Sequence, residues 1–184
     1  MKDSTGRKMN DEEFERFCLA NPDLRIERNS NLEILIMSPN TPLSGQHGAE
    51  ILRQLLNWNF ENNKGVVFDA SAGFTLPDRS ILSPDASWMS HERWASVSPD
   101  EREKFSRVCP EFVIEVRSDS FKDLKSKMES WVRNGAKLGW LIDPKRNTHW
   151  IYRPGADPVE INNELIPGEG SVEGFILDMK LFRD

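Results

Sequence analysis

The sequence has few cysteines and no long hydrophobic run. Cys18 and Cys109 lie far apart in the chain, so they form neither a metal-ligand spacing nor a disulfide framework. No stretch approaches the roughly 18 apolar residues of a transmembrane helix, and no apolar segment follows the N-terminal basic residues as it would in a signal peptide. We therefore expect buried thiols in a reducing compartment, a cytoplasmic location and no membrane partner.

The sequence also lacks an excess of basic residues. It has 24 Lys and Arg against 30 Asp and Glu, a formal net charge of −6. This excludes a protein that coats nucleic acid through a uniformly basic surface. The charge is uneven, however, because residues 117–153 carry nine basic and four acidic side chains, a net +5 that leaves −11 for the rest. Such a segment is typical of a polyanion-facing surface or, equally, of a solvated helix face.

The patterning predicts one α/β domain over residues 1–184. Helical spacing predicts helices after Asn10, from Ser44 to Gly65 and over 120–134, with one or two short helices within 91–107. Strands are expected at 24–27, 32–37, 66–70, 73–76, 83–89, 112–116, 138–142 and 148–153. We expect residues 1–8 to be flexible and residues 156–184 to form short strands and turns, so that helices surround a mixed sheet.

Glu115 is the most informative residue, because it lies inside the apolar run 112–116. A lone ionised carboxylate is costly there, so it requires a partner, a metal ion or a raised pKa. Strand alternation places Glu115 and Arg117 on one face. The alternative to a functional role is a salt bridge from Glu115 to Arg117 or to a lysine.

Asp85 follows Pro84 at the start of an expected strand. A Ser-Pro-Asp turn is a common structural device in which the carboxylate accepts a nearby N–H. Together with a buried Glu115, Asp85 could instead hold a hard cation such as magnesium, which prefers one or two carboxylates and water.

A lysine on the helix after Glu115 could complete such a site. On a helical projection, Lys125 and Lys127 border opposite edges of the apolar face. Periodicity does not choose between them, and the usual fate of a lysine at such a border is a solvent-exposed ammonium.

The order and spacing of several motifs resemble one protein family. The motifs are Ser83-Pro84-Asp85, the run 111–118 around Glu115, Asp123-Leu124 with Lys127-Met128, Trp131 and Gly135, and the run 140–144. Together they resemble the Uma-two family of predicted endonucleases, in the PD-(D/E)XK restriction-endonuclease-like superfamily. The resemblance covers residues 9–155.

This resemblance implies a three-layer α/β/α restriction-endonuclease-like core with a mixed β-sheet, preceded by an N-terminal helix and β-hairpin. It implies that Asp85, Glu115 and the Val116 carbonyl bind Mg²⁺ or Mn²⁺, and that Lys127 is the catalytic lysine. Arg117 stands where the superfamily has lysine and could bind phosphate, as could Lys125. Glu27, His47 and Glu50 are auxiliary candidates for which a surface or capping role is the alternative. Trp131 occupies a slot that is usually tyrosine, which we interpret as a packing change.

The expected function is metal-dependent hydrolysis of DNA phosphodiester bonds, with the basic segment 117–153 facing the nucleic-acid backbone. A homodimer would suit such an enzyme, because a double-strand break needs two cuts. The alternatives are a nuclease-fold module that binds nucleic acid with little activity, and a protein-interaction domain whose tryptophans form a partner surface.

Overall fold

The computed structural model describes residues 2–117 and 120–182. The chain forms two compact units, and the single domain expected from the sequence stays a prediction. The N-terminal unit comprises 1–39, 71–83 and 97–109, and the core unit comprises 40–70, 84–96 and 110–184. Ser118 and Asp119, which belong to the basic segment and to the motif around Glu115, lie outside the described residues.

The core unit is built on a mixed six-stranded sheet with the order β11-β10-β9-β8-β7-β4. Strands β8 and β9 are parallel, and every other neighbouring pair in this sheet is antiparallel. The strands are β4 (Gly65–Asp69), β7 (Ala86–Ser90), β8 (Phe112–Val116), β9 (Leu138–Asp143), β10 (Thr148–Tyr152) and β11 (Val159–Ile161). All five residues of β8 and all six of β9 are buried, which explains their nearly continuous apolar sequences.

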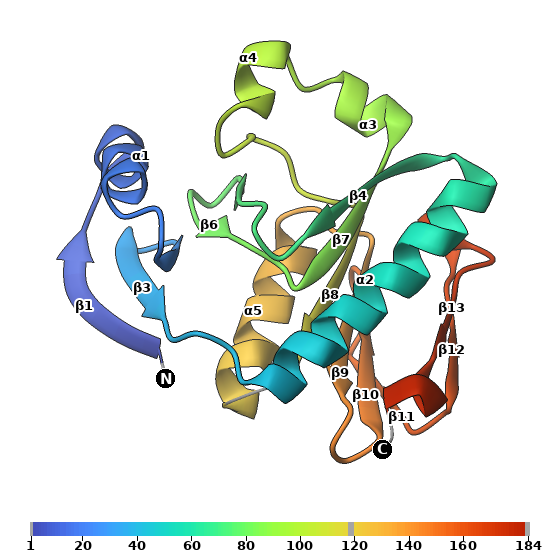
Figure 1. Cartoon of the computed structure of the whole chain (residues 1–184). Coiled ribbons are helices and arrows are strands. Elements are labelled where there is room, and N and C mark those ends of the chain that lie inside the picture. The colour runs from blue at the N-terminus through green and yellow to red at the C-terminus, as the bar shows by residue number, and fades with distance from the viewer. Residues whose placement is uncertain (1, 118–119, 183–184) are drawn as a thin grey trace. The chain divides into compact units, whose positions relative to one another are not determined.

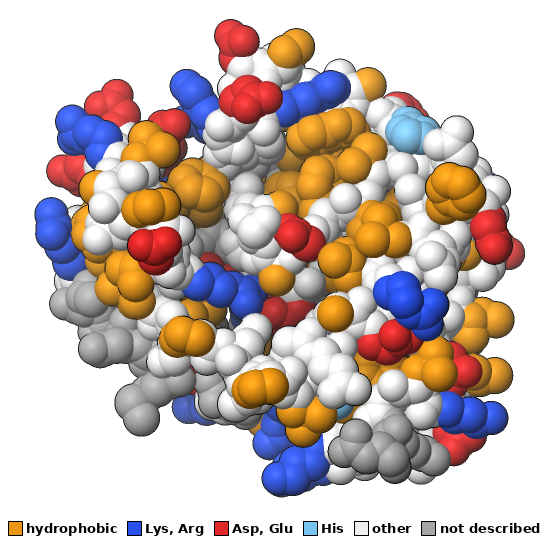
Figure 2. Space-filling view, viewed as in Figure 1, with side chains coloured by type: hydrophobic (Ala, Val, Ile, Leu, Met, Phe, Trp, Pro, Cys, Tyr) orange, Lys and Arg blue, Asp and Glu red, His pale blue; other side chains and the backbone are white. Residues whose placement is uncertain are grey.

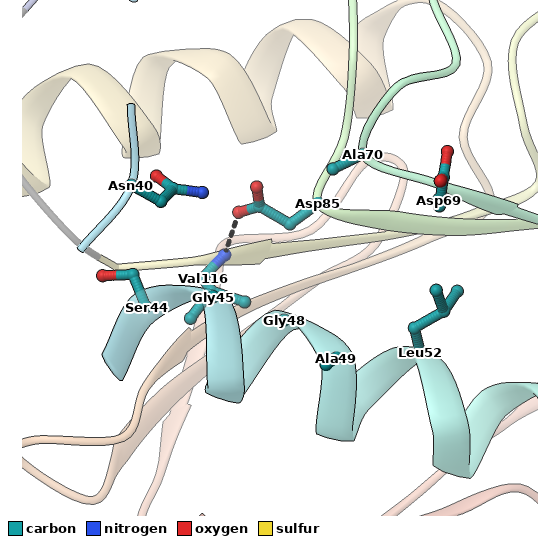
Figure 3. Close-up of a pocket in the computed structure, with 10 residues that line it drawn as sticks. All are labelled: Asn40, Ser44, Gly45, Gly48, Ala49, Leu52, Asp69, Ala70, Asp85 and Val116. Carbon is teal, nitrogen blue, oxygen red and sulfur yellow. Dashed lines mark hydrogen bonds between the residues drawn. The ribbon is translucent and has the colours of Figure 1, made fainter. Parts of the chain in front are cut away.

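Two long helices cover opposite faces of this sheet, which gives the expected three-layer arrangement (Figures 1 and 3). Helix α2 (Pro42–Asn62) packs Ile51, Leu55 and Trp58 into a core cluster with Ile114 of β8. Helix α5 (Phe121–Arg133) packs on the other face. Alternation along β8 therefore directs Ile114 towards α2 and Glu115 towards α5.

The hairpin of β12 (Leu165–Pro167) and β13 (Ile176–Asp178) and the 3₁₀ turns η1 (Gly170–Val172) and η2 (Met179–Phe182) cover the α2 face of the sheet. The short helix α3 (His91–Ala95) instead contacts β4 and β7, with Trp94 packed against Phe68. Ile166, Val172, Phe175 and Leu177 join the same core cluster. His149 of β10 is fully buried, and neither of its ring nitrogens has a hydrogen-bond partner within the described part of the chain.

The N-terminal unit contains a five-stranded antiparallel sheet with the order β1-β3-β2-β6-β5. Its elements are β1 (Lys2–Lys8), α1 (Asp11–Ala20), β2 (Arg25–Arg28), β3 (Glu33–Met37), β5 (Phe74–Thr75), β6 (Ile81–Leu82) and α4 (Pro99–Arg102). A capping box begins α1, because Asn10 and Glu13 each accept a hydrogen bond from the other's backbone N–H at 2.9 Å. Residues 2–8 form β1, which pairs with β3.

Two expected boundaries of α2 are wrong. The helix begins at Pro42 rather than Ser44, because Thr41 is the N-cap and accepts a hydrogen bond from the Ser44 N–H. At the other end the helix stops at Asn62, before the expected Gly65, and Asn63, with φ of 46°, is its left-handed C-cap. Gly65 instead opens β4, where a Cβ atom would lie 2.2 Å from the Met89 carbonyl oxygen.

Hydrophobic side chains gather over α2, α3 and β4 on the face shown in Figure 2. Phe60 of α2 is 87% exposed and Leu56, one turn earlier, is 45% exposed. Over residues 2–117 and 120–182, no helix combines the length and the apolar character needed to cross a membrane.

Candidate active site

The buried carboxylate of Glu115, in β8, is contacted by two side chains of α5, the Lys127 ammonium and the Trp131 indole. Glu115 and Lys127 are 1% and 8% exposed, and the Lys127 Nζ lies 2.9 Å from Oε1 and 3.1 Å from Oε2 of Glu115. The Trp131 Nε1 donates a hydrogen bond of 2.8 Å to Glu115 Oε1. The carboxylate therefore has the charged partner that its burial requires.

The structure brings Lys127, and not Lys125, to Glu115. Lys127 and Trp131 are four residues apart in α5 and so lie on one face of the helix. The Lys125 Nζ instead lies over two aromatic rings, 4.5 Å from the centroid of Phe121 and 5.8 Å from that of Trp150. The alternative of a salt bridge between Glu115 and a lysine is thus present, inside the site rather than at the surface.

Asp85 is located at the end of the neighbouring strand. The antiparallel β7–β8 ladder ends at the pair of Ala86 and Ile114, so Asp85 lies just beyond the end of β7. The Asp85 N–H donates to the Ile114 carbonyl at 3.0 Å, and Asp85 Oδ2 accepts the Val116 N–H at 2.7 Å. Both hydrogen bonds fix Asp85 to the end of β8, so the backbone-binding role of a Ser-Pro-Asp turn is also realised.

A pocket of about 240 Å³ opens beside Asp85 (Figure 3). Helix α2 lines one side with Ser44, Gly45 and Gly48, while Asp85 and Val116 line the other. In Figure 3 the Asp85 carboxylate points towards the side of the pocket occupied by Asn40. No atom lies within 4 Å of the Cβ position of either glycine, so the absence of side chains on α2 leaves open space in front of the carboxylate.

The donor set of this site fits a hard cation. Within the described part of the chain, no three His, Cys, Asp or Glu side chains gather to hold a metal ion. Magnesium needs only one or two carboxylates, because it retains waters and binds substrate phosphate. Asp85 lines the pocket, and Glu115 stands between Ile114 and Val116, the two β8 residues to which Asp85 is hydrogen-bonded, so the site offers two such carboxylates.

Arg117 is bound to other groups of the core unit. Its Nη1 lies 2.6 Å from Asp143 Oδ2, and its guanidinium lies 4.7 Å from the centroid of the Phe121 ring. Its charge is therefore compensated by Asp143, which is itself buried.

The three auxiliary candidates have structural partners. Glu27 belongs to the N-terminal unit, where its buried Oε1 accepts the Ser83 N–H at 3.1 Å. His47 of α2 contacts the Phe182 ring, with centroids 5.6 Å apart. Glu50 binds Arg53, whose hydrogen bonds hold the pKa of the Glu50 carboxyl below its ordinary value.

Much of the positive charge in segment 117–153 is neutralised within the fold. Among the residues that the structure describes, at least five of its nine basic side chains form ion pairs with carboxylates. They are Arg117, Lys127, Lys137, Arg146 and Arg153. The net charge of +5 in this segment therefore overstates the positive charge that is available to bind a polyanion.

Comparison with known proteins then decides the family. A family model described as a putative restriction endonuclease, Uma2, matches residues 11–180. The chain belongs to the Uma2 family. Membership of the Uma2 family supports a nuclease function in general terms. No curated protein matches the sequence.

The fold is also that of a solved structure. A crystal structure of a putative nuclease belonging to DUF820 from Anabaena variabilis ATCC 29413 superposes with a TM-score of 0.77. It is 19% identical to this Uma2 chain, and the match covers 93% of this chain and 95% of that one. At this level of identity the likeness establishes a shared nuclease fold, and the site must be argued from its own residues.

The sequence interpretation missed two features of the site. Trp131 was assigned to packing, although its spacing of four residues from Lys127 predicts that both side chains reach the same strand residue. Gly45 and Gly48 stand three residues apart in a helical pattern, which is the available signal for an open groove along α2.

Proposed function

We propose that the protein is a metal-dependent endonuclease that hydrolyses DNA phosphodiester bonds. The observation that carries the proposal is that Asp85 is hydrogen-bonded to Ile114 and Val116, the two neighbours of Glu115 in β8, while the Lys127 ammonium contacts Glu115 itself. Paired carboxylates beside a buried lysine supply what phosphodiester hydrolysis needs, a cation site and a positive charge for the phosphate.

Asp85, Glu115 and the Val116 carbonyl would hold Mg²⁺ or Mn²⁺. When bound, such a cation polarises a phosphoryl oxygen and lowers the pKa of a coordinated water. The Lys127 ammonium stabilises negative charge that develops on the phosphate, because it is a fixed charge in a site with little water. The hydrogen bond from the Val116 N–H holds the Asp85 carboxylate at the pocket.

The pocket between α2 and Asp85 is the proposed path of the scissile strand. The open space above Gly45 and Gly48 allows a sugar-phosphate backbone to approach the helix closely. Lys125 adds a cation on the α5 side of the sheet. A homodimer, which would present two such sites to a duplex, and a cytoplasmic location stay predictions from the sequence.

We expect Asp85→Asn to abolish nicking of supercoiled plasmid DNA in Mg²⁺ or Mn²⁺, as EDTA does for the wild type. Loss of a ligand that positions the cation removes several kcal/mol of transition-state stabilisation, or about 10³-fold in rate. Asp157→Asn, a change at an exposed carboxylate, is the matched control. Wild-type protein that binds plasmid but leaves it intact with either metal would favour the binding-module alternative, and preferential cutting of RNA would contradict the DNA assignment.

Substitutions at Gly48, in the pocket beside Asp85, are expected to affect stability and cleavage differently according to the size of the new side chain. Because nothing lies near its Cβ position, Gly48→Ala should raise the free energy of unfolding by about 0.5–1 kcal/mol through helix propensity. Gly48→Leu should reduce cleavage on the order of 10²-fold, since a small displacement of the reacting phosphate has that effect. Denaturant titration and plasmid cleavage measure the two quantities. Gln46→Leu adds the same side chain outside the pocket, so an equal loss of cleavage in both leucine variants would rule out the groove.

A further inference from the structure

Two residues of α5 contact Glu115, and they differ in the kind of interaction they make. The Lys127 Nζ is almost equally distant from both carboxylate oxygens, at 2.9 and 3.1 Å. An ammonium acts as a compact charge with rotatable donors, so it neutralises the carboxylate without selecting one orientation. Trp131 instead directs a single N–H at Oε1, at 2.8 Å.

The orientation of a carboxylate needs such a directional contact. The terminal torsion of a glutamate side chain is broad, because it joins a tetrahedral carbon to a planar group. An indole N–H held rigidly in a fully buried ring restricts this torsion, whereas an apolar ring of the same size would not.

We propose that Trp131 is a positioning residue that orients the Glu115 carboxylate for metal binding. The inference rests on the proposed function, because it assigns Glu115 to the cation site. It replaces the interpretation of Trp131 as a packing residue. Residues that hydrogen-bond to metal ligands fix ligand orientation, and their loss typically reduces metal affinity or activity by about 10–100-fold.

The chain contains a matched control for this role. Trp140 of β9 is also fully buried, and it packs against Phe112 and Phe175 on the α2 side of the sheet. Within residues 2–117 and 120–182, its Nε1 has no hydrogen-bond partner. Trp140→Phe therefore removes a comparable volume from the core without removing a contact to Glu115.

The test compares wild type, Trp131→Phe, Trp131→Tyr and Trp140→Phe in the full chain. Titration calorimetry with Mn²⁺ alone gives the metal affinity, and plasmid cleavage gives kcat and KM. We expect Trp131→Phe to weaken Mn²⁺ binding by about 10–100-fold and to lower kcat with KM unchanged. Trp140→Phe should retain both values, and Trp131→Tyr should recover part of the loss because its hydroxyl is a donor.

The outcomes separate the two proposals. If the wild type cuts DNA and Trp131→Phe matches Trp140→Phe in Mn²⁺ affinity and kcat, the positioning role is overturned and the proposed function stands. A wild type that neither binds Mn²⁺ nor cuts overturns the proposed function, and the positioning role with it. If Trp131→Phe does not fold, Trp131→Tyr decides. Tyrosine is smaller than tryptophan but keeps a hydrogen-bond donor. A tyrosine variant with unchanged Mn²⁺ affinity and kcat would therefore show that packing volume is unimportant and would support the role of the N–H contact.

Discussion

Glu115→Ala is expected to lower the free energy of unfolding by about 3–5 kcal/mol, in addition to abolishing cleavage. The variant leaves the Lys127 ammonium, only 8% exposed, without the carboxylate that compensates it. It also leaves the Trp131 N–H without its acceptor. Urea titration monitored by circular dichroism measures the loss, and stability equal to that of the wild type would show that the ion pair is not buried in solution.

This expected loss changes how the catalytic role must be tested, because an inactive single variant could simply be unfolded. The double variant Glu115→Gln with Lys127→Met removes both charges and keeps a carbonyl acceptor for Trp131. Replacing a buried ion pair with uncharged side chains often changes the free energy of unfolding little. We therefore expect this variant to be folded and inactive. Lys122→Met, a change at an exposed lysine, is the control for the loss of one lysine from α5. Cleavage by the double variant would remove Glu115 and Lys127 from the mechanism.

A second large effect is expected at His149, which should make the protein less stable in mild acid. Burial lowers the pKa of His149 from 6.5 to about 4, although the Asp143 carboxylate partly opposes this shift. Below pH 6.5 the unfolded chain binds a proton that the folded chain does not, so stability falls as the pH decreases towards 4. At pH 5 the loss from this residue is about 2 kcal/mol.

His149→Leu isolates this contribution from the carboxylates that titrate in the same range. The leucine cannot bind a proton, and it removes two ring nitrogens that lack partners among the described residues. We therefore expect the variant to gain stability over the wild type as the pH is lowered from 7.5 to 5. If the difference in free energy of unfolding between the two proteins were the same at pH 7.5 and pH 5, His149 would not stay neutral in the folded protein.

The sequence was sufficient to predict those helices and strands whose residue pattern reflects their burial in the folded protein. The run 112–116 was predicted with its observed bounds, because a strand buried on both faces is apolar almost throughout. The helix over α5 and the start of a helix after Asn10 followed equally from local rules. The family resemblance added the three-layer arrangement, and the family model and the fold confirm that part.

Other features depend on tertiary contacts that local rules do not contain. Lys125 and Lys127 are equivalent on a helical projection, and only the way α5 packs on β8 brings Lys127 to the carboxylate. Strand β1 has few apolar residues, so its pairing with β3 was not visible in the pattern. The ion pair of Arg117 with Asp143 joins residues 26 positions apart, a separation that no short-range pattern addresses.

The contacts of Glu115 also bear on the order in which the site forms. Lys127 and Trp131 are 12 and 16 residues from Glu115, whereas the hydrogen bond from Val116 to Asp85 spans 31 residues. Closing a short loop costs less chain entropy than closing a long one. The β8–α5 half of the site can therefore assemble early in folding, before β7 docks and adds Asp85. Cleavage competence during refolding should consequently follow the docking of β7 rather than the formation of α5.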